Sequence, residues 1–329
     1  MTWTGKQVLV TGAGGFIGSH LVERLVTDGA DVTACIRYTS RGDIGLLRLL
    51  DRQILESLRV VPGDLRDPVA VKNASAGQSI IFHLGALVSI PYSYVNPTEV
   101  AEVNVMGTLN VLNAALESGV ERLVHTSTSE TYGTARTVPM AESHPLQAQS
   151  PYSASKIGAD AIAHSYARSF DLPVSTIRPF NVYGPRQSGR AVIPTIIGQA
   201  LNSEQVSLGC LTPTRDFTYV TDTVEGFIDV AGSQNSVGKV VNIGSGEEIS
   251  IGDLARRILA RLGRDIPVNV SDERVRPESS EVFRLKSDSS LAKEMLGWKP
   301  KVTLDEGIDR VIEFLRANPD WVAVERYEV

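Results

Sequence analysis

Tyr152 and Lys156 are the two residues whose types and spacing suggest chemistry most directly. They are four positions apart in a predicted helix over residues 151–170, so both side chains lie on one helix face. A free tyrosine has a pKa of about 10, and lowering that pKa to neutrality costs about 4 kcal/mol. A lysine cation about 4 Å away in a partly buried site supplies an interaction of that size. The pair therefore suits removal of a hydroxyl proton while a hydride leaves the same carbon.

A polar triplet, Thr128, Ser129 and Glu130, follows a predicted strand over residues 122–127. In a doubly wound sheet the carboxyl ends of the strands line the ligand crevice, so we expect Thr128 to hydrogen-bond the reacting oxygen. Glu130 suits the removal of a second proton, such as one α to a newly formed ketone. The alternative for Glu130 is a loop salt bridge or a helix cap.

Three glycines, Gly12, Gly15 and Gly18, lie between a predicted buried strand over residues 7–11 and a predicted helix over residues 16–28. A strand, a glycine turn and a helix N-terminus together bind pyrophosphate through bare backbone N–H groups and the helix dipole. The sequence therefore predicts a dinucleotide site, whereas the alternative is a turn that only packs a helix on a strand.

Other residues at strand ends extend this cofactor prediction. Asp64 follows the third strand and is expected to accept a hydrogen bond from an adenine amino group, unless it is a plain turn residue. Where NAD-preferring folds usually carry an acid, this chain has Arg37, which favours a 2′-phosphate and hence NADP over NAD, unless it is a solvated surface arginine. The predicted cofactor-binding residues are Gly12, Gly15, Phe16, Ile17, Gly18, Arg37, Asp64, Leu65, Leu84, Gly85, Ala86, Tyr152 and Lys156.

Composition excludes several classes of function. The 329 residues are 42% hydrophobic and 21% charged, with a net charge of −6, which disfavours nucleic acid or an anionic membrane as a partner. No stretch approaches the ~18 apolar residues of a membrane span. The first strand begins within a few residues of the N-terminus, so we expect a cytoplasmic protein without a signal peptide. Two isolated cysteines and five histidines without ligand spacing predict neither a disulfide nor a metal site.

The order of predicted elements indicates an α/β fold with a Rossmann-like, doubly wound parallel sheet and a smaller α/β substrate-binding lid domain. We expect the dinucleotide-binding domain to take residues 1–178 and about 216–243, and the lid domain to take about 179–215 and 244–329. Strands are predicted over residues 7–11, 31–36, 58–62, 80–84, 122–127, 173–178 and 240–243. Helices are predicted near residues 16–28, 43–56, 98–118, 151–170, 250–262 and 304–317.

Motifs along nearly the whole chain resemble the extended short-chain dehydrogenase/reductase family, and within it the nucleotide-sugar 4,6-dehydratases. The matching segments are residues 11–18, 63–67, 104–108, 128–130, 152–156, 178–185, 215–220, 242–246 and 296–300. Residues 90–94, 144–151 and 213–217 look most like N-acetylglucosamine-nucleotide 4,6-dehydratases of the legionaminic acid type. The Thr-Ser-Glu triplet and the Ile36-Arg37 pair also resemble GDP-mannose 4,6-dehydratase, in which the arginine goes with NADP.

This resemblance implies a mechanism. Tyr152 takes the C4 hydroxyl proton as hydride passes from C4 to the nicotinamide, Glu130 removes the C5 hydrogen, water leaves from C6, and the hydride returns to C6. Many relatives carry Asp where this chain has Ser129, so either Glu130 acts as both base and acid or Ser129 relays a proton. The resemblance also implies a homodimer through the helix near Tyr152 and its predecessor. The residues it implies for substrate binding are Ser89, Asn181, Val192, Arg215 and Arg276.

Other functions are compatible with part of this pattern. The same triplet, tyrosine and lysine also resemble those of UDP-glucuronate decarboxylases. A nucleotide-sugar 4-epimerase usually lacks the glutamate, so Glu130 argues against it. A non-catalytic cofactor sensor generally loses the tyrosine or the lysine, and this chain has both.

Overall fold

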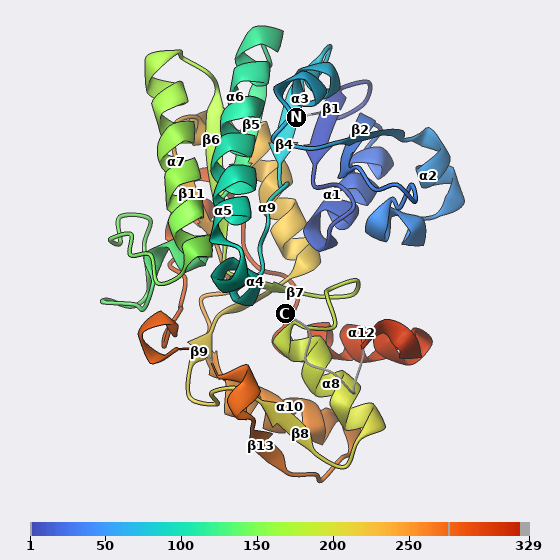
Figure 1. Cartoon of the computed structure of the whole chain (residues 1–329), viewed down its shortest axis with the longest axis vertical. Helices are drawn as coiled ribbons and strands as arrows, with labels where there is room; N and C mark the ends of the chain where they lie inside the picture. The colour runs from blue at the N-terminus through green and yellow to red at the C-terminus, as the bar shows by residue number, and fades with distance from the viewer. Residues whose placement is uncertain (1, 276, 323–329) are drawn as a thin grey trace.

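The computed structural model describes residues 2–275 and 277–322. Its centre is a parallel sheet in which the strands stand in the order β11-β6-β5-β4-β1-β2-β3 (Figure 1). The predicted doubly wound α/β class is confirmed. The strands are β1 (Gln7–Thr11), β2 (Asp31–Arg37), β3 (Arg59–Gly63), β4 (Ile80–His83), β5 (Arg122–Thr126), β6 (Val174–Pro179) and β11 (Val240–Ile243).

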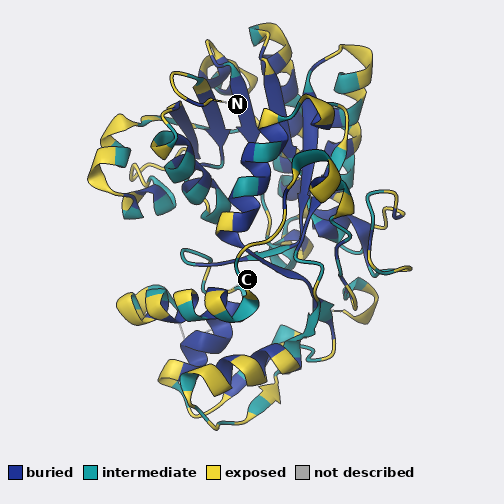
Figure 2. Cartoon of the chain, turned by 180° about the vertical axis from the view of Figure 1, so that it is seen from behind, coloured by how far each residue is buried: buried dark blue, intermediate teal, exposed yellow. Residues whose placement is uncertain are grey.

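Helices cover both faces of this sheet, which explains why its strands are apolar at nearly every position. In β1, Val8 and Val10 belong to one hydrophobic cluster and Leu9 to another, on opposite faces. The first face is covered by α1 (Phe16–Thr27) and α9 (Val220–Gly232), and the second by α3 (Pro68–Ser75), α6 (Gly107–Ser118) and α7 (Pro151–Ser169). Figure 2 shows the buried strands between helices whose outer faces are exposed.

Two predicted helices are interrupted in the structure. The helix predicted near residues 98–118 is α5 (Pro97–Ala101), then a π-helical turn (Glu102–Met106), then α6. The helix predicted near residues 43–56 is a 3-10 turn (Gly45–Leu49) followed by α2 (Arg52–Ser57). A further short helix, α4 (Ile90–Val95), was not predicted, and it begins at the Ser89 cap beside the sheet edge.

A smaller layer lies beyond the carboxyl ends of the strands (Figure 1). It contains α8 (Val192–Asn202), α10 (Ile251–Leu262) and α12 (Leu304–Ala317), which pack together, with α11 (Ser290–Leu296) beside β11. Its short strands are β7 (Asn181–Tyr183), β8 (Val206–Leu208), β9 (Thr214–Arg215), β10 (Phe217–Tyr219), β12 (Ile249–Ser250) and β13 (Val268–Val270). The exact domain boundaries stay a prediction.

The helix that carries Tyr152 is closely specified by its own sequence. Ser150 and Ser153 form a reciprocal capping box, and Pro151 occupies the first helical turn. These contacts fix where α7 begins, so Tyr152 lies in the first turn of that helix. Within the described part of the chain, no helix has the length and apolar character needed to cross a membrane.

Candidate active site

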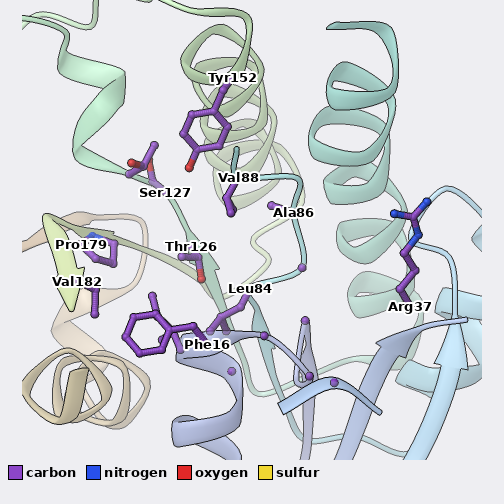
Figure 3. Close-up of a pocket in the computed structure, with 18 of the residues that line it drawn as sticks. Phe16, Arg37, Leu84, Ala86, Val88, Thr126, Ser127, Tyr152, Pro179 and Val182 are labelled. Atoms are coloured by element: carbon purple, nitrogen blue, oxygen red, sulfur yellow. The ribbon is translucent and has the colours of Figure 1, made fainter. Parts of the chain in front are cut away.

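A cavity of about 710 Å³ opens at the carboxyl ends of β1, β4 and β5, where the strand order reverses. Such a switch point is where doubly wound sheets bind ligands. Its walls come from separate parts of the chain: the glycine turn after β1, Leu84–Ala86 after β4, residues 126–130 after β5, Tyr152 on α7 and Asn181–Val182 on β7. Figure 3 shows Phe16, Thr126 and Tyr152 on different sides of this space, with Arg37 at its far end.

The glycine turn fits a dinucleotide diphosphate. Gly12 has a φ of 70°, and a Cβ on it would lie 2.8 Å from Gly85 Cα, so the backbones after β1 and β4 nearly touch. Helix α1 follows Gly15 without a side-chain cap, which leaves its first N–H groups to face a ligand. Phe16, Ile17 and Gly18 carry these groups, and the first cavity reaches all three. The described residues contain no cluster of His, Cys, Asp or Glu that could hold a metal ion.

The predicted adenosine end of the site is already engaged in ion pairs. A side cavity of about 130 Å³ is lined by Arg37, Asp64, Leu65 and Gly85. Asp64 lies 2.6 Å from Arg66, and this pairing lowers the pKa of Asp64. The Arg37 side chain is 65% exposed and its Nη2 lies 3.3 Å from Glu99 Oε1. The structure thus places both residues at the cavity, while their roles toward the adenine and the 2′-phosphate stay predictions.

Tyr152 is buried, and its hydroxyl points into the cavity (Figure 3). Burial raises the pKa of Tyr152, a hydrogen bond with Thr128 opposes the rise, and the charges of Glu130 and Asp160 add to it. Removal from water thus dominates the pKa of Tyr152 in the chain by itself, and the expected effect of Lys156 on that pKa stays a prediction.

The polar triplet after β5 forms a short turn against the cavity. Thr128 caps this 3-10 turn (Ser129–Tyr132) by accepting the Glu130 N–H, so Glu130 is not the cap. Among the residues described, the Glu130 carboxylate has no ion pair. It is half-buried and lines the cavity together with Thr128, Ser129 and Tyr152. A carboxylate, a phenol and two hydroxyl groups thus belong to the lining of one cavity.

The predicted substrate residues surround a second cavity of about 490 Å³ between the sheet and the smaller layer. Ser89 caps α4, Val192 begins α8, and Asn181 Oδ1 is buried without a hydrogen-bond partner. Arg215 is buried and committed to the protein: its Nη1 donates to Val282 O at 2.6 Å and its Nη2 to Glu281 Oε1 at 3.0 Å. Arg276 lies outside the described residues.

A buried polar cluster behind Lys156 was missed at the sequence level. Asp160 Oδ2 accepts from Ser127 Oγ and from Arg178 Nη2, both at 2.6 Å, and Asp160 Oδ1 lies 3.0 Å from His125 Nε2. Arg178 Nε also donates to Ser127 Oγ at 3.2 Å. The available signal was that Asp160 follows Lys156 by four residues, on the face that Tyr152 and Lys156 share.

A second missed feature is a chain of hydrogen bonds through His83. Thr108 Oγ1 donates its only proton to Asn104 O at 2.6 Å, so it must accept from His83 Nε2 at 3.0 Å. The other ring nitrogen, Nδ1, then accepts from Thr11 Oγ1 at 2.8 Å, and Thr11 Oγ1 accepts from the Gly85 N–H at 3.1 Å. This chain links α6 to the loop after β4 that lines the dinucleotide cavity.

The chain matches a family model described as GDP-mannose 4,6 dehydratase over residues 9–311. It is 36% identical to a UDP-glucose 4-epimerase of Mycolicibacterium smegmatis over 318 residues, covering 94% of this chain and 98% of the relative. It is 32% identical to the dTDP-D-glucose 4,6-dehydratase of Mus musculus, covering 98% of this chain and 92% of the relative. A third relative, UDP-glucuronic acid decarboxylase 1 of Xenopus tropicalis, is 32% identical, covering 98% of this chain and 75% of the relative.

Solved structures agree with these matches. The dTDP-glucose 4,6-dehydratase DesIV of Streptomyces venezuelae, with NAD and TYD bound, superposes with a TM-score of 0.86 at 32% identity. That alignment covers 96% of this chain and 98% of DesIV. MoeE5, in complex with UDP-glucose and NAD, has a TM-score of 0.82 at 32% identity, covering 94% of this chain and 99% of MoeE5.

Proposed function

Because this chain belongs to the GDP-mannose 4,6-dehydratase family of enzymes that act on nucleotide sugars, we propose that it is itself a nucleotide-sugar 4,6-dehydratase. The proposed substrate is UDP- or GDP-N-acetylglucosamine, and the product is the 4-keto-6-deoxy sugar nucleotide. The observation that carries the proposal is that Glu130 and Tyr152 line the same cavity.

Each reacting residue of this cavity has a distinct task in the proposed reaction. The chemistry supplied by a bound nicotinamide dinucleotide is reversible acceptance of a hydride. Tyr152 takes the proton of the C4 hydroxyl, and Thr128 hydrogen-bonds that oxygen. Glu130 takes the C5 proton, which the C4 ketone acidifies, and a proton from Glu130 or through Ser129 lets the C6 hydroxyl leave as water. C5 finally takes up a solvent proton, which balances the proton that Tyr152 accepted.

The cofactor, the sugar and the assembly are finer parts of the proposal. Arg37 supports NADP, whereas the solved structures of DesIV and MoeE5 hold NAD. The N-acetylglucosamine assignment depends on the segments 90–94, 144–151 and 213–217. A homodimer through α6 and α7 is supported by two exposed apolar residues, Leu116 on α6 at 38% and Phe170 directly after α7 at 52%.

A substrate panel tests the reaction. UDP-, GDP-, CDP- and dTDP-sugars are incubated with the protein and either NAD or NADP, and the products are identified by mass spectrometry and chromatography. We expect UDP- or GDP-N-acetylglucosamine to lose one water. Loss of carbon dioxide from UDP-glucuronate would instead support a decarboxylase, and interconversion of C4 epimers without a change in mass would support an epimerase. No change in any of these sugars would leave the cofactor-sensing function.

Glu130→Gln separates the two proton transfers. We expect this variant still to oxidise C4, seen as the absorbance of reduced nicotinamide, because Tyr152 is intact. Deuterium from heavy water should no longer enter C5, because the neutral amide cannot act as a base, and turnover should fall by about 100- to 10,000-fold.

Tyr152→Phe is the matched control, since it should block both the absorbance change and the exchange while still binding cofactor. Continued deuterium uptake in Glu130→Gln would assign the C5 base to another residue.

A further inference from the structure

The network behind Lys156 is a group of buried charges that the proposed reaction does not use. We propose that Asp160 is a positioning residue that keeps Lys156 in its charged form beneath Tyr152, by holding one fixed negative charge a helical turn behind the lysine. This inference rests on the proposed use of the Tyr152–Lys156 pair, but it does not depend on the identity of the sugar.

The geometry places these three side chains in one column. Tyr152, Lys156 and Asp160 are spaced by four residues on α7, so they project from one face of that helix in successive turns. All three are buried, with exposed fractions of 7%, 4% and 2%. Water therefore screens their mutual interaction weakly, and a single carboxylate has a strong effect on a neighbouring ammonium group.

The surroundings hold the Asp160 carboxylate in its ionised form and in one orientation. Both oxygens are hydrogen-bonded, Oδ1 by His125 and Oδ2 by Ser127 and Arg178. These partners keep the pKa of Asp160 below its usual value although burial opposes them. Arg178 is fixed in turn, because its guanidinium lies 4.6 Å above the centre of the Tyr132 ring. Contacts with β5 and β6 thus hold the negative charge of Asp160 in one place between α7 and the sheet.

The charge balance explains why a carboxylate is needed here. Burial lowers the pKa of Lys156 to about 8, and Asp160 is the charge that opposes this fall. Among the described residues, Asp160 is the anion that both Lys156 and Arg178 face. Without Asp160, two buried cations would share the site with no anion between them.

The other elements packed against α7 contribute no second anion to Lys156. Strands β4 and β5 contribute His83 and His125, whose pKa values are held low by burial and by Lys156 itself. The turn after β5 brings Glu130, which acts on Tyr152. The acids of α5 and the π-helical turn are engaged elsewhere: Glu99 with Tyr92 and Arg37, and Glu102 with Arg66. Asp160 is therefore the anion that Lys156 meets among the described residues.

Asp160→Asn and Arg178→Gln form a matched pair of variants for the test. Each removes the same ion pair, but the first leaves a buried cation and the second a buried anion. Lys156 is titrated in the NAD-bound protein, without any sugar, by NMR of lysine labelled with ¹³C at Cε, with Lys156→Met assigning the signal.

We expect Asp160→Asn to lower the titration midpoint of Lys156 by about one pH unit or more, since a neighbouring opposite charge in a buried site shifts a pKa by that amount. Arg178→Gln should leave the midpoint at or above its wild-type value. A residue with a purely structural role would move both midpoints alike.

If Asp160→Asn does not fold, the double variant Asp160→Asn/Arg178→Gln removes the uncompensated cation, and its midpoint should lie below that of Arg178→Gln. A midpoint in Asp160→Asn equal to wild type, or one in the double variant equal to that of Arg178→Gln, would overturn the proposal. Because no sugar is present, that result is distinct from a failure of the dehydratase assignment, which the substrate panel alone decides.

Discussion

Lys156 carries its charge at a position where only 4% of the residue is exposed. Burial lowers the pKa of this lysine to about 8. An unfolded lysine has a pKa of about 10.4, so between these values the unfolded chain binds a proton that the folded protein releases. The folded state therefore gains stability as the pH rises through this window, and below it the charged lysine costs stability. In the proposed reaction, this same buried cation favours ionisation of Tyr152.

Lys156→Met should therefore stabilise the protein while abolishing turnover. At pH 7 we expect the free energy of unfolding in urea to rise by up to about 3 kcal/mol, and the difference from wild type to shrink as the pH increases from about 8 to 10. Lys239→Met, at an exposed lysine, is the control and should show no such pH dependence. A Lys156→Met variant that is less stable than wild type at pH 7 would contradict the argument.

Arg37 tests the cofactor preference at the level of a single side chain. Arg37→Ala should weaken NADP binding about tenfold or more, because a charge-assisted hydrogen bond to the 2′-phosphate contributes about 1.5–3 kcal/mol. NAD lacks that phosphate and should bind almost unchanged. Dissociation constants for both cofactors follow from calorimetry, with Arg48→Ala as a control on a surface arginine. An equal loss for both cofactors would remove the preference for NADP.

At the scale of elements, the dinucleotide loop is positioned from behind by a helix. The hydrogen-bond chain from α6 runs through Thr108, His83 and Thr11 to the Gly85 N–H. Its directions require His83 to be neutral with its proton on Nε2, and burial holds the pKa of His83 well below its usual value. A charged or reversed ring would break one link, so the backbone that meets Gly12 depends on this one tautomer.

Thr108→Val should remove the acceptor for the His83 Nε2–H while keeping the side-chain shape. A buried donor left unpaired costs about 1–3 kcal/mol, which urea unfolding can measure. Thr108→Ser retains the hydroxyl and should stay close to wild type. Nitrogen-15 NMR of the His83 ring should show the proton on Nε2 in the wild-type protein, and a proton on Nδ1 would contradict the assigned directions.

Elements that are defined by local burial and capping were predictable from the sequence. Features that depend on contacts between distant segments were not. The strand over Gln7–Thr11 and the helix over Leu304–Ala317 have the predicted bounds because burial and capping define them locally. The π-helical turn at Glu102–Met106 was missed because one extra residue in a turn barely alters the apolar periodicity. The Asp160–Arg178 pair depends on which strand lies under α7, and residue spacing along the chain does not contain that information.

The same distinction applies to the candidate site. The sequence predicted that the glycine turn, the polar triplet and Tyr152 would come together, and all of them line one cavity. Lys156 is not among the residues that line it. The raised pKa of Tyr152 could not be predicted, because it follows from the depth of burial. Nor could the engagement of Arg215, because its partners Glu281 and Val282 come from a segment 66 residues further along the chain.

At the scale of the whole molecule, the cavity that Tyr152 lines and the second cavity beside the smaller layer share part of their lining. Asn181 and Arg215 line both spaces, one from β7 and one from β9. A nucleotide sugar that places its hexose near Tyr152 would thus extend its diphosphate past Arg215. The chain already holds this guanidinium with the Glu281 carboxylate, whose side chain is 12% exposed. The ligand and Glu281 would then compete for one cation.

Glu281→Gln resolves whether this competition limits binding. The amide keeps the shape of the side chain but removes the charge that repels a diphosphate, so UDP or GDP should bind several-fold more tightly in calorimetry. Arg215→Gln should weaken binding of the same nucleotide by about tenfold or more, since hydrogen bonds to charged groups contribute about 1.5–3 kcal/mol. If Glu281→Gln weakened binding as much as Arg215→Gln, Glu281 would be orienting the guanidinium for the ligand rather than competing with it. The two variants together therefore tell whether the smaller layer is held ready for the diphosphate or must exchange an internal partner to accept it.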